Sequence, residues 1–210
     1  PTKTEFENET GVLIDRPTLL VTLHPATLDD VDPETQSQEL LAAIEMRRDF
    51  RIIFTLPNSD PGSEVIRKKI SQFVSHNKHR STVHASLGSR MYLAALSLVD
   101  GVVGNSSSGI IEAPSFGVGT VNIGKRQQGR IFGDSVISCH PKRHSIAEAI
   151  DQITSSDFRD KIKGKNNPYG DGQASERIIG YLDSLDLNNL SLKRFHDLQN
   201  TLAVGKNGAK

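Results

Sequence analysis

Short apolar runs alternate with segments of helical spacing along most of the chain, and this alternation restricts the possible folds more than any other feature. Six runs are expected to form strands, at residues 18–23, 51–56, 81–84, 101–103, 120–123 and 135–138. Helical spacing is found between them, at residues 35–48, 63–74, 89–98 and 145–153. Strands that alternate with helices are typical of βαβ units. We therefore expect residues 12–165 to form a Rossmann-like, doubly wound α/β domain with a parallel sheet.

Polar motifs follow the expected strands at the points where the strands end. His24 follows the first strand, Asn58 the second, Ser106 the fourth and Arg126 the fifth. In doubly wound sheets, ligands bind at the carboxyl ends of the strands. These four positions therefore predict a binding site along this edge of the sheet.

Residues 103–114 (VGNSSSGIIEAP) have the sequence of a strand end, a tight turn and a helix start. Small residues in such a turn let backbone N–H groups and hydroxyls face an anion, and the positive end of a helix dipole would add to them. Glu112 would repel phosphate but could accept hydrogen bonds from sugar hydroxyls. The segment therefore predicts a site for a nucleotide or nucleotide sugar. The alternative is an ordinary loop in which a serine caps a helix.

One histidine and two arginines add candidate groups to this site. His24 is either a phosphate ligand or an acid–base group, or it only caps the end of a strand. Arg126 and Arg130 lie four residues apart after the fifth strand. Guanidinium groups suit diphosphate oxygens, and the alternative for these arginines is a solvated basic loop.

The composition argues against several classes of protein. Twenty-five Lys and Arg residues balance twenty-five Asp and Glu residues, which disfavours bulk nucleic-acid binding. The single cysteine, Cys139, excludes an internal disulfide and a cysteine-based zinc site, and it fits a reducing, cytoplasmic location. We expect no metal, because no His, Asp and Glu cluster has ligand spacing, and no membrane association, because no apolar run is long enough. Without a Walker A motif or a GxGxxG turn after the first strand, ATPase and dehydrogenase activities lose support.

The two ends of the chain differ from its centre. Residues 1–11 are polar and patternless, and they are expected to be disordered or to begin a linker. Residues 166–204 begin with a turn-rich connector and should continue in helices at 174–185 and 190–202 that pack on the domain. Residues 205–210 are expected to be a frayed tail. The chain begins with proline rather than methionine, so we expect it to be one domain of a longer protein.

Five motifs occur together in an order that resembles a known family. They are residues 23–27 (LHPAT), 56–62 (LPNSDPG), 104–114 (GNSSSGIIEAP), 122–130 (NIGKRQQGR) and 167–172 (NPYGDG). Over roughly residues 12–200 the chain resembles the C-terminal half of the hydrolysing UDP-N-acetylglucosamine 2-epimerases of sialic acid biosynthesis. The non-hydrolysing relatives resemble it less, because they usually carry an Asp-Ser-Gly-Gly turn where this chain has residues 105–109 (NSSSG).

The resemblance implies a GT-B-like enzyme in which this chain would be the second of two Rossmann-like domains that face a cleft. The implied partners are a UDP-sugar substrate, the N-terminal domain of the same enzyme and further copies in a homo-oligomer, a dimer or tetramer. The implied reaction converts UDP-N-acetylglucosamine to N-acetylmannosamine and UDP by elimination of UDP and addition of water, without a cofactor. Because the family's acid–base carboxylates belong largely to the other domain, we expect this chain alone to be inactive.

The resemblance also implies a role for each candidate residue. Ser106 and Ser107 would hold the diphosphate, and Glu112 would accept hydrogen bonds from the ribose hydroxyls. The catalytic candidates are His24, at the diphosphate and sugar, and Arg126, which would neutralise charge on the departing UDP. The rest of the expected UDP site consists of Asn58 at the cleft mouth, Arg130, and His84, Ser86 and Gly88 beside uracil.

Three other functions remain open at this point. The chain could belong to an epimerase of a related UDP-diamino sugar, because the choice of sugar is set partly by the other domain. It could also be a GT-B glycosyltransferase domain. A third possibility is a stand-alone nucleotide-binding module without chemistry.

Overall fold

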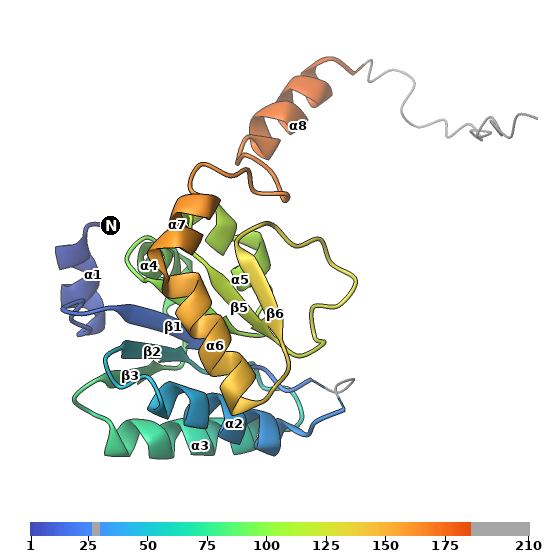
Figure 1. The fold of residues 1–210 in the computed structure, drawn as a ribbon. Helices are drawn as coiled ribbons and strands as arrows, with labels where there is room; N and C mark the ends of the chain where they lie inside the picture. The colour runs from blue at the N-terminus through green and yellow to red at the C-terminus, as the bar shows by residue number, and fades with distance from the viewer. Residues whose placement is uncertain (27–29, 186–210) are drawn as a thin grey trace, which may run out of the picture. The chain divides into compact units, whose positions relative to one another are not determined.

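The computed structural model describes residues 1–26 and 30–185, and it contains a six-stranded parallel sheet (Figure 1). The strands are β1 (Thr18–Thr22), β2 (Arg51–Thr55), β3 (Ser81–His84), β4 (Gly101–Gly104), β5 (Thr120–Ile123) and β6 (Val136–Cys139). They are ordered β3-β2-β1-β4-β5-β6, which is the order of a Rossmann fold. The expected Rossmann-like α/β fold is confirmed, and each strand lies within one residue of its predicted range.

Helices connect the strands and cover both faces of the sheet. They are α1 (Lys3–Thr10), α2 (Pro33–Glu45), α3 (Ser63–His76), α4 (Gly88–Leu96), α5 (Ser108–Ile111), a 3-10 turn η1 (Ala113–Phe116), α6 (Arg143–Thr154), α7 (Ser156–Ile162) and α8 (Ala174–Asp183). The predicted helices correspond to α2, α3, α4, α6 and α8, and the helix start predicted after the serine turn corresponds to α5. Helices α1 and α7 were not predicted.

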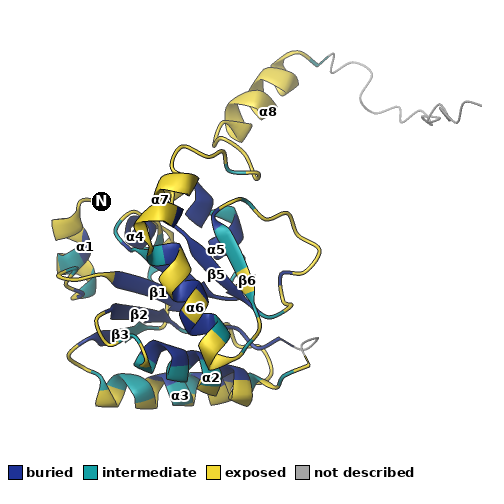
Figure 2. Ribbon diagram, viewed as in Figure 1, coloured by how far each residue is buried: buried dark blue, intermediate teal, exposed yellow. Residues whose placement is uncertain are grey.

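The central strands of the sheet are buried between two apolar clusters, which explains why they have no solvent-exposed polar face. Along β1 the side chains alternate: Leu19 and Val21 belong to a cluster with α2, α3 and α6, whereas Leu20 belongs to a cluster with α1 and α4. All five residues of β1 and of β2 are buried, as Figure 2 shows. Packing on both faces holds the strands in place, and with them the edge of the sheet on which the polar motifs lie.

Gly104 lets the end of β4 approach β1 more closely than any other residue would allow. Its φ is 141°, and a Cβ atom placed there would lie 1.8 Å from the carbonyl oxygen of Thr22. Because Thr22 and Gly104 pair across the strands, the segments that follow them, with His24 and Asn105, emerge side by side. The strand order reverses between β1 and β4, so these segments lie at the topological switch point.

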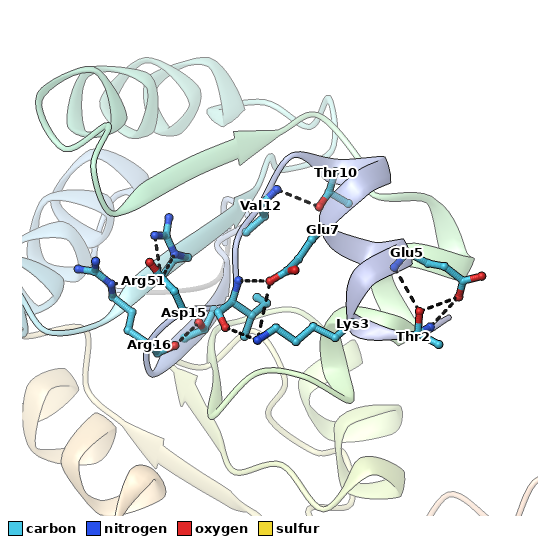
Figure 3. A network of polar contacts seen from close by, with 11 residues as sticks. Thr2, Lys3, Glu5, Glu7, Thr10, Val12, Asp15, Arg16 and Arg51 are labelled. Atoms are coloured by element: carbon cyan, nitrogen blue, oxygen red, sulfur yellow. Dashed lines mark hydrogen bonds and ion pairs between the residues drawn. The ribbon is translucent and has the colours of Figure 1, made fainter.

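Residues 1–11 were expected to be disordered or to begin a linker, but most of them form helix α1. Thr2 and Glu5 form a reciprocal capping box at its N-terminus, and Phe6 is fully buried in the cluster with α4. The chain then folds back, so that the Glu7 carboxylate accepts from the Ile14 N–H at 2.8 Å (Figure 3). The sequence prediction missed this helix because a single apolar residue carries its packing.

The connector after residue 165 is fixed to the domain over its first part. Asn167 Nδ2 donates to the carbonyl of Ile111 and to Ser115 Oγ, both at 2.7 Å, and the Tyr169 hydroxyl donates to the carbonyl of Ile131 at 2.9 Å. The chain divides into two compact units between Asp171 and Gly172, rather than at residue 165.

Helix α8 belongs to the second unit and was predicted as a helix from its apolar stripe. None of its residues is buried, and its large apolar side chains, Ile178, Ile179, Tyr181 and Leu182, are each more than half exposed. The predicted packing of this region stays a prediction. The helix predicted at 190–202 and the frayed tail lie outside the described residues.

Candidate functional site

A cavity of about 650 Å³ opens at the carboxyl ends of β1, β2 and β3, beside helix α4. It is lined by Thr22, His24, Thr55, Leu56, Pro57, Asn58, Arg67, Ala85, Ser86, Leu87, Gly88, Ser89, Tyr92, Leu93 and Glu112. Five of the residues predicted from the sequence therefore share one cavity: His24, Asn58, Ser86, Gly88 and Glu112. Ser106, Ser107, Arg126, Arg130 and His84 are not among its lining residues.

His24 is held at the end of β1 by an amide clamp. Its backbone N–H donates to Asn105 Oδ1 at 2.7 Å, and its carbonyl accepts from Asn105 Nδ2 at 2.8 Å. The Asn58 N–H points at His24 Nδ1 at 3.4 Å, which leaves the proton of the neutral ring on Nε2. Burial lowers the pKa of His24, and the nearby Arg126 charge lowers it further, against a smaller opposing effect of Asp60. His24 is therefore neutral near pH 7, with one N–H to donate.

Arg126 is anchored to the same asparagine. The Asn105 carbonyl accepts from Arg126 Nη1 at 3.1 Å and from the buried Gln127 Nε2 at 2.7 Å. A guanidinium group thus lies close to His24 although the two residues are far apart in the sequence. Arg130, at the other end of the basic loop, is exposed.

The serine turn after β4 differs from the prediction in one respect. Helix α5 has only four residues, and the 3-10 turn η1 follows it from Ala113. Pro114 lacks an N–H and disfavours helical geometry at the residue before it, so the α-helix does not continue. The expected contribution of a helix dipole is therefore small, and an anion here would depend on hydroxyl and N–H donors.

Glu112 follows this short helix, and its side chain reaches the cavity. Its Oε2 atom is buried and has no hydrogen-bond partner among the described residues. A buried carboxylate oxygen costs free energy unless it accepts a hydrogen bond. The cavity therefore contains an acceptor that a hydroxyl-bearing ligand would satisfy.

Two other predicted residues lie outside this cavity. His84 ends β3 and is half-buried; burial lowers the pKa of its ring, and its Nε2 has no partner in the described part of the chain. Ser107 lies at the start of α5 without a side-chain capping bond. These two assignments stay predictions.

A family model of UDP-N-acetylglucosamine 2-epimerases matches residues 2–183 of the chain. The chain belongs to this family. Polysialic acid biosynthesis protein P7 of Escherichia coli is 35% identical over 200 residues, which cover 94% of this chain and 50% of that protein. The GDP/UDP-N,N'-diacetylbacillosamine 2-epimerase (hydrolyzing) of Campylobacter jejuni is 29% identical over 93% of this chain and 51% of its own length.

Solved structures of epimerases have the same fold. The Neisseria meningitidis UDP-GlcNAc 2-epimerase bound to UDP-GlcNAc superimposes with a TM-score of 0.68 at 19% identity, over 86% of this chain and 48% of that one. The chain spans about half the length of the curated relatives it matches.

Several residues that line this cavity were not predicted from the sequence. Thr22 and Thr55 end neighbouring strands, and their hydroxyls lie 2.5 Å apart on the cavity floor. Tyr92 reaches the cavity from the second turn of α4, and Arg67 reaches it from α3. A polar residue at the end of an apolar strand is a signal that could have found the threonines. The tyrosine and the arginine carry no comparable signal, because only the fold places them here.

Asn105 lies in the motif at residues 104–114, and no role was predicted for it from the sequence. Its fully buried side chain and carbonyl join β1, β4 and the basic loop.

Among the described residues, no group of three or more His, Cys, Asp and Glu could hold a metal ion. The described helices are also too short or too polar to cross a membrane.

Proposed function

We propose that the chain is the UDP-binding half of a hydrolysing UDP-N-acetylglucosamine 2-epimerase, which converts its substrate and water into N-acetylmannosamine and UDP. The observation that carries the proposal is Glu112, whose unpartnered, buried carboxylate oxygen reaches a cavity next to a serine-rich turn. A nucleoside diphosphate offers two ribose hydroxyls at one point and phosphate oxygens a short distance away. Membership of the epimerase family supports this interpretation.

The proposed ligand follows the carboxyl edge of the sheet. Uracil would lie against residues 84–88, which include the predicted His84, Ser86 and Gly88. The ribose hydroxyls would donate to Glu112, and the diphosphate would lie toward Ser106 and Ser107. His24 would donate from Nε2 to the diphosphate, and Arg126, supported by Arg130, would oppose its charge.

The proposed reaction has two steps. A base removes the C2 proton while the C1–O bond to the β-phosphate breaks, and UDP leaves with the electron pair of that bond. Water then adds to the resulting 2-acetamidoglucal: its hydroxyl goes to C1, and a proton reaches C2 from the opposite face. Arg126 and His24 would stabilise the departing diphosphate. The proton-transferring carboxylates would belong to a second domain, of the kind that forms the other half of the relatives.

A related UDP-diamino sugar is the second candidate substrate. It is favoured by the similarity to the Campylobacter jejuni protein, whose name gives N,N'-diacetylbacillosamine as the sugar. The two substrates share UDP, so the residues described here serve both. Activity of the longer protein on each UDP sugar would decide between them. A glycosyltransferase would instead require an acceptor and would release no free sugar.

Titration calorimetry with UDP, uridine and inorganic phosphate tests the binding proposal. We expect UDP to bind weakly, because one wall of a cleft supplies only part of the contacts, and uridine to bind more weakly still. In Glu112→Ala, UDP should lose about 1.5–3 kcal/mol of binding free energy, the usual contribution of a hydrogen bond to a charged group. UDP binding should be weakened more than the binding of inorganic phosphate. Equal binding of UDP and 2′,3′-dideoxy-UDP to the wild type would contradict the ribose assignment.

The chain alone should turn over no UDP-N-acetylglucosamine. Its residues can hold and neutralise UDP, but Glu112 is assigned to the ribose and no second carboxylate lines the cavity. We expect N-acetylmannosamine release at background levels, and activity when the protein carries a second domain. Release by this chain that disappears in His24→Ala would show instead that a complete catalytic site lies within it.

A further inference from the structure

Tyr92 is the physical link between the cavity and the serine turn. Its ring lines the cavity from α4, and its hydroxyl is hydrogen-bonded to Ser108 Oγ. Ser108 Oγ in turn donates to Ser106 Oγ at 3.3 Å, and the Ser108 N–H points at the same Ser106 oxygen at 3.4 Å. Three hydroxyls from two distant segments therefore form one continuous chain.

The chain of hydroxyls has a defined direction. A serine hydroxyl carries one proton, and that of Ser108 is used on Ser106. The Tyr92 hydroxyl must therefore donate to Ser108. Ser106 receives two hydrogen bonds at its oxygen, which leaves its own proton free for an acceptor outside the turn. Hydrogen bonds in such a chain polarise one another, so the Ser106 hydroxyl is a better donor than an isolated serine.

Tyr92 also lies near the proposed ribose acceptor. Burial raises the pKa of Tyr92 and the Glu112 charge raises it further, whereas hydrogen bonds with Ser108 and Thr22 oppose this; the pKa is raised on balance, so the phenol keeps its proton. Tyr92 thus contacts the serine turn through Ser108 and shares the cavity with Glu112. A ligand that extends from a ribose to a phosphate would pass this side chain.

We propose that Tyr92 is a positioning residue that acts through Ser108 to aim the Ser106 hydroxyl proton at a phosphate of the nucleoside diphosphate. This inference rests on the proposed function. It also separates the serines: Ser106 is the directed donor, whereas Ser108 relays and does not touch the ligand. The hydroxyl of Tyr92, rather than its ring, should matter for binding of the phosphate part only.

Calorimetry with UDP and uridine on Tyr92→Phe tests the proposal, because phenylalanine keeps the ring and removes only the hydroxyl. We expect the Kd for UDP to rise about five- to tenfold, as for the loss of one neutral hydrogen bond, and the Kd for uridine to stay within about twofold. The ³¹P resonances of bound UDP should also shift, which a purely structural role would not produce. Tyr181→Phe, an exposed tyrosine on α8, is the matched control and should change neither Kd.

A double-mutant cycle provides the second test. Ser108→Ala should reproduce the effect of Tyr92→Phe, and the double variant should be no weaker than either single variant, because both act through one chain. Additive losses of UDP-binding free energy in the double variant, or equal losses for UDP and uridine, would contradict the proposal that Tyr92 acts through Ser108. If Tyr92→Phe fails to fold, Ser108→Ala alone carries the same comparison. A wild type that binds no UDP would refute the proposed function itself, whereas UDP binding with an unchanged UDP-to-uridine ratio in both variants would refute only the role of Tyr92.

Discussion

On the β1–β2–β3 side of the sheet edge the polar groups line a cavity, whereas on the β4–β5 side Glu112 reaches this cavity and the other polar groups lie on short loops. The cavity collects side chains from strand ends, α3 and α4, such as Thr55, Arg67 and Tyr92. The β4–β5 side draws its groups from two continuous motifs, residues 104–114 and 122–130. A phosphate-type turn can therefore be predicted from a continuous stretch of sequence, whereas a cavity forms only when the fold brings distant segments together.

The two sides are joined at Gly104, and a substitution there should have the largest effect. Gly104→Ala would place a methyl group against the Thr22 carbonyl, at a φ that L-residues rarely adopt, so β1 and β4 could not pair. We expect no cooperative folding in urea or thermal denaturation. The matched control is Gly117→Ala, where φ is 64° but no atom lies within 4 Å of the new Cβ, and where the cost should be about 1–2 kcal/mol. A normal unfolding transition for Gly104→Ala would contradict the close approach.

Asn105→Ala should remove the side-chain hydrogen bonds that join the two sides, and it introduces no steric clash. It leaves the buried N–H and carbonyl of His24 without partners, each of which costs roughly 1–3 kcal/mol. Chemical denaturation should show a loss of about 2–4 kcal/mol in the free energy of unfolding. Asn58→Ala, at an exposed side chain, is the control and should stay within about 0.5 kcal/mol of the wild type. Similar values for the two variants would mean that Asn105 does not hold β1 and β4 together.

Acidification should lower the free energy of unfolding through His24, on the cavity side of the sheet edge. This effect should be smaller than those of the two substitutions above. Its folded-state pKa is lowered, chiefly by burial, while the unfolded value is about 6.5. Below about pH 6.5 the unfolded chain takes up the proton first, so the free energy of unfolding falls as the pH drops toward and through the folded pKa. His24→Gln should remove this part of the slope, and His79→Gln, at an exposed histidine, should not. Equal slopes in both variants would place the ring of His24 in solvent.

The sequence predicted the sheet almost completely, because buried parallel strands are short apolar runs with turn residues at their ends. It also predicted His24, Asn58, Ser86, Gly88 and Glu112, which the fold brings to one cavity. The sequence-based prediction failed where one or two contacts decide whether a helix forms or where it ends. Helix α1 depends on Phe6 and a capping box, and the early end of α5 depends on the geometry before Pro114. Tyr92 and Arg67 lie on helices whose apolar periodicity indicates the buried face but not which neighbouring polar side chains reach the cavity.

Titration of the ¹⁵N-labelled chain with UDP, followed by amide chemical shifts, tests the proposed UDP site most directly. We expect the largest shifts on both sides of the switch point, at Ser86, Gly88 and Glu112 in the cavity and at Ser106 and Arg126 beyond it. Uridine should shift the cavity group and leave the serine turn nearly unchanged. Shifts confined to another hollow, such as the one lined by His140, Lys142 and His144 beside the start of α6, would contradict the assignment of the UDP site.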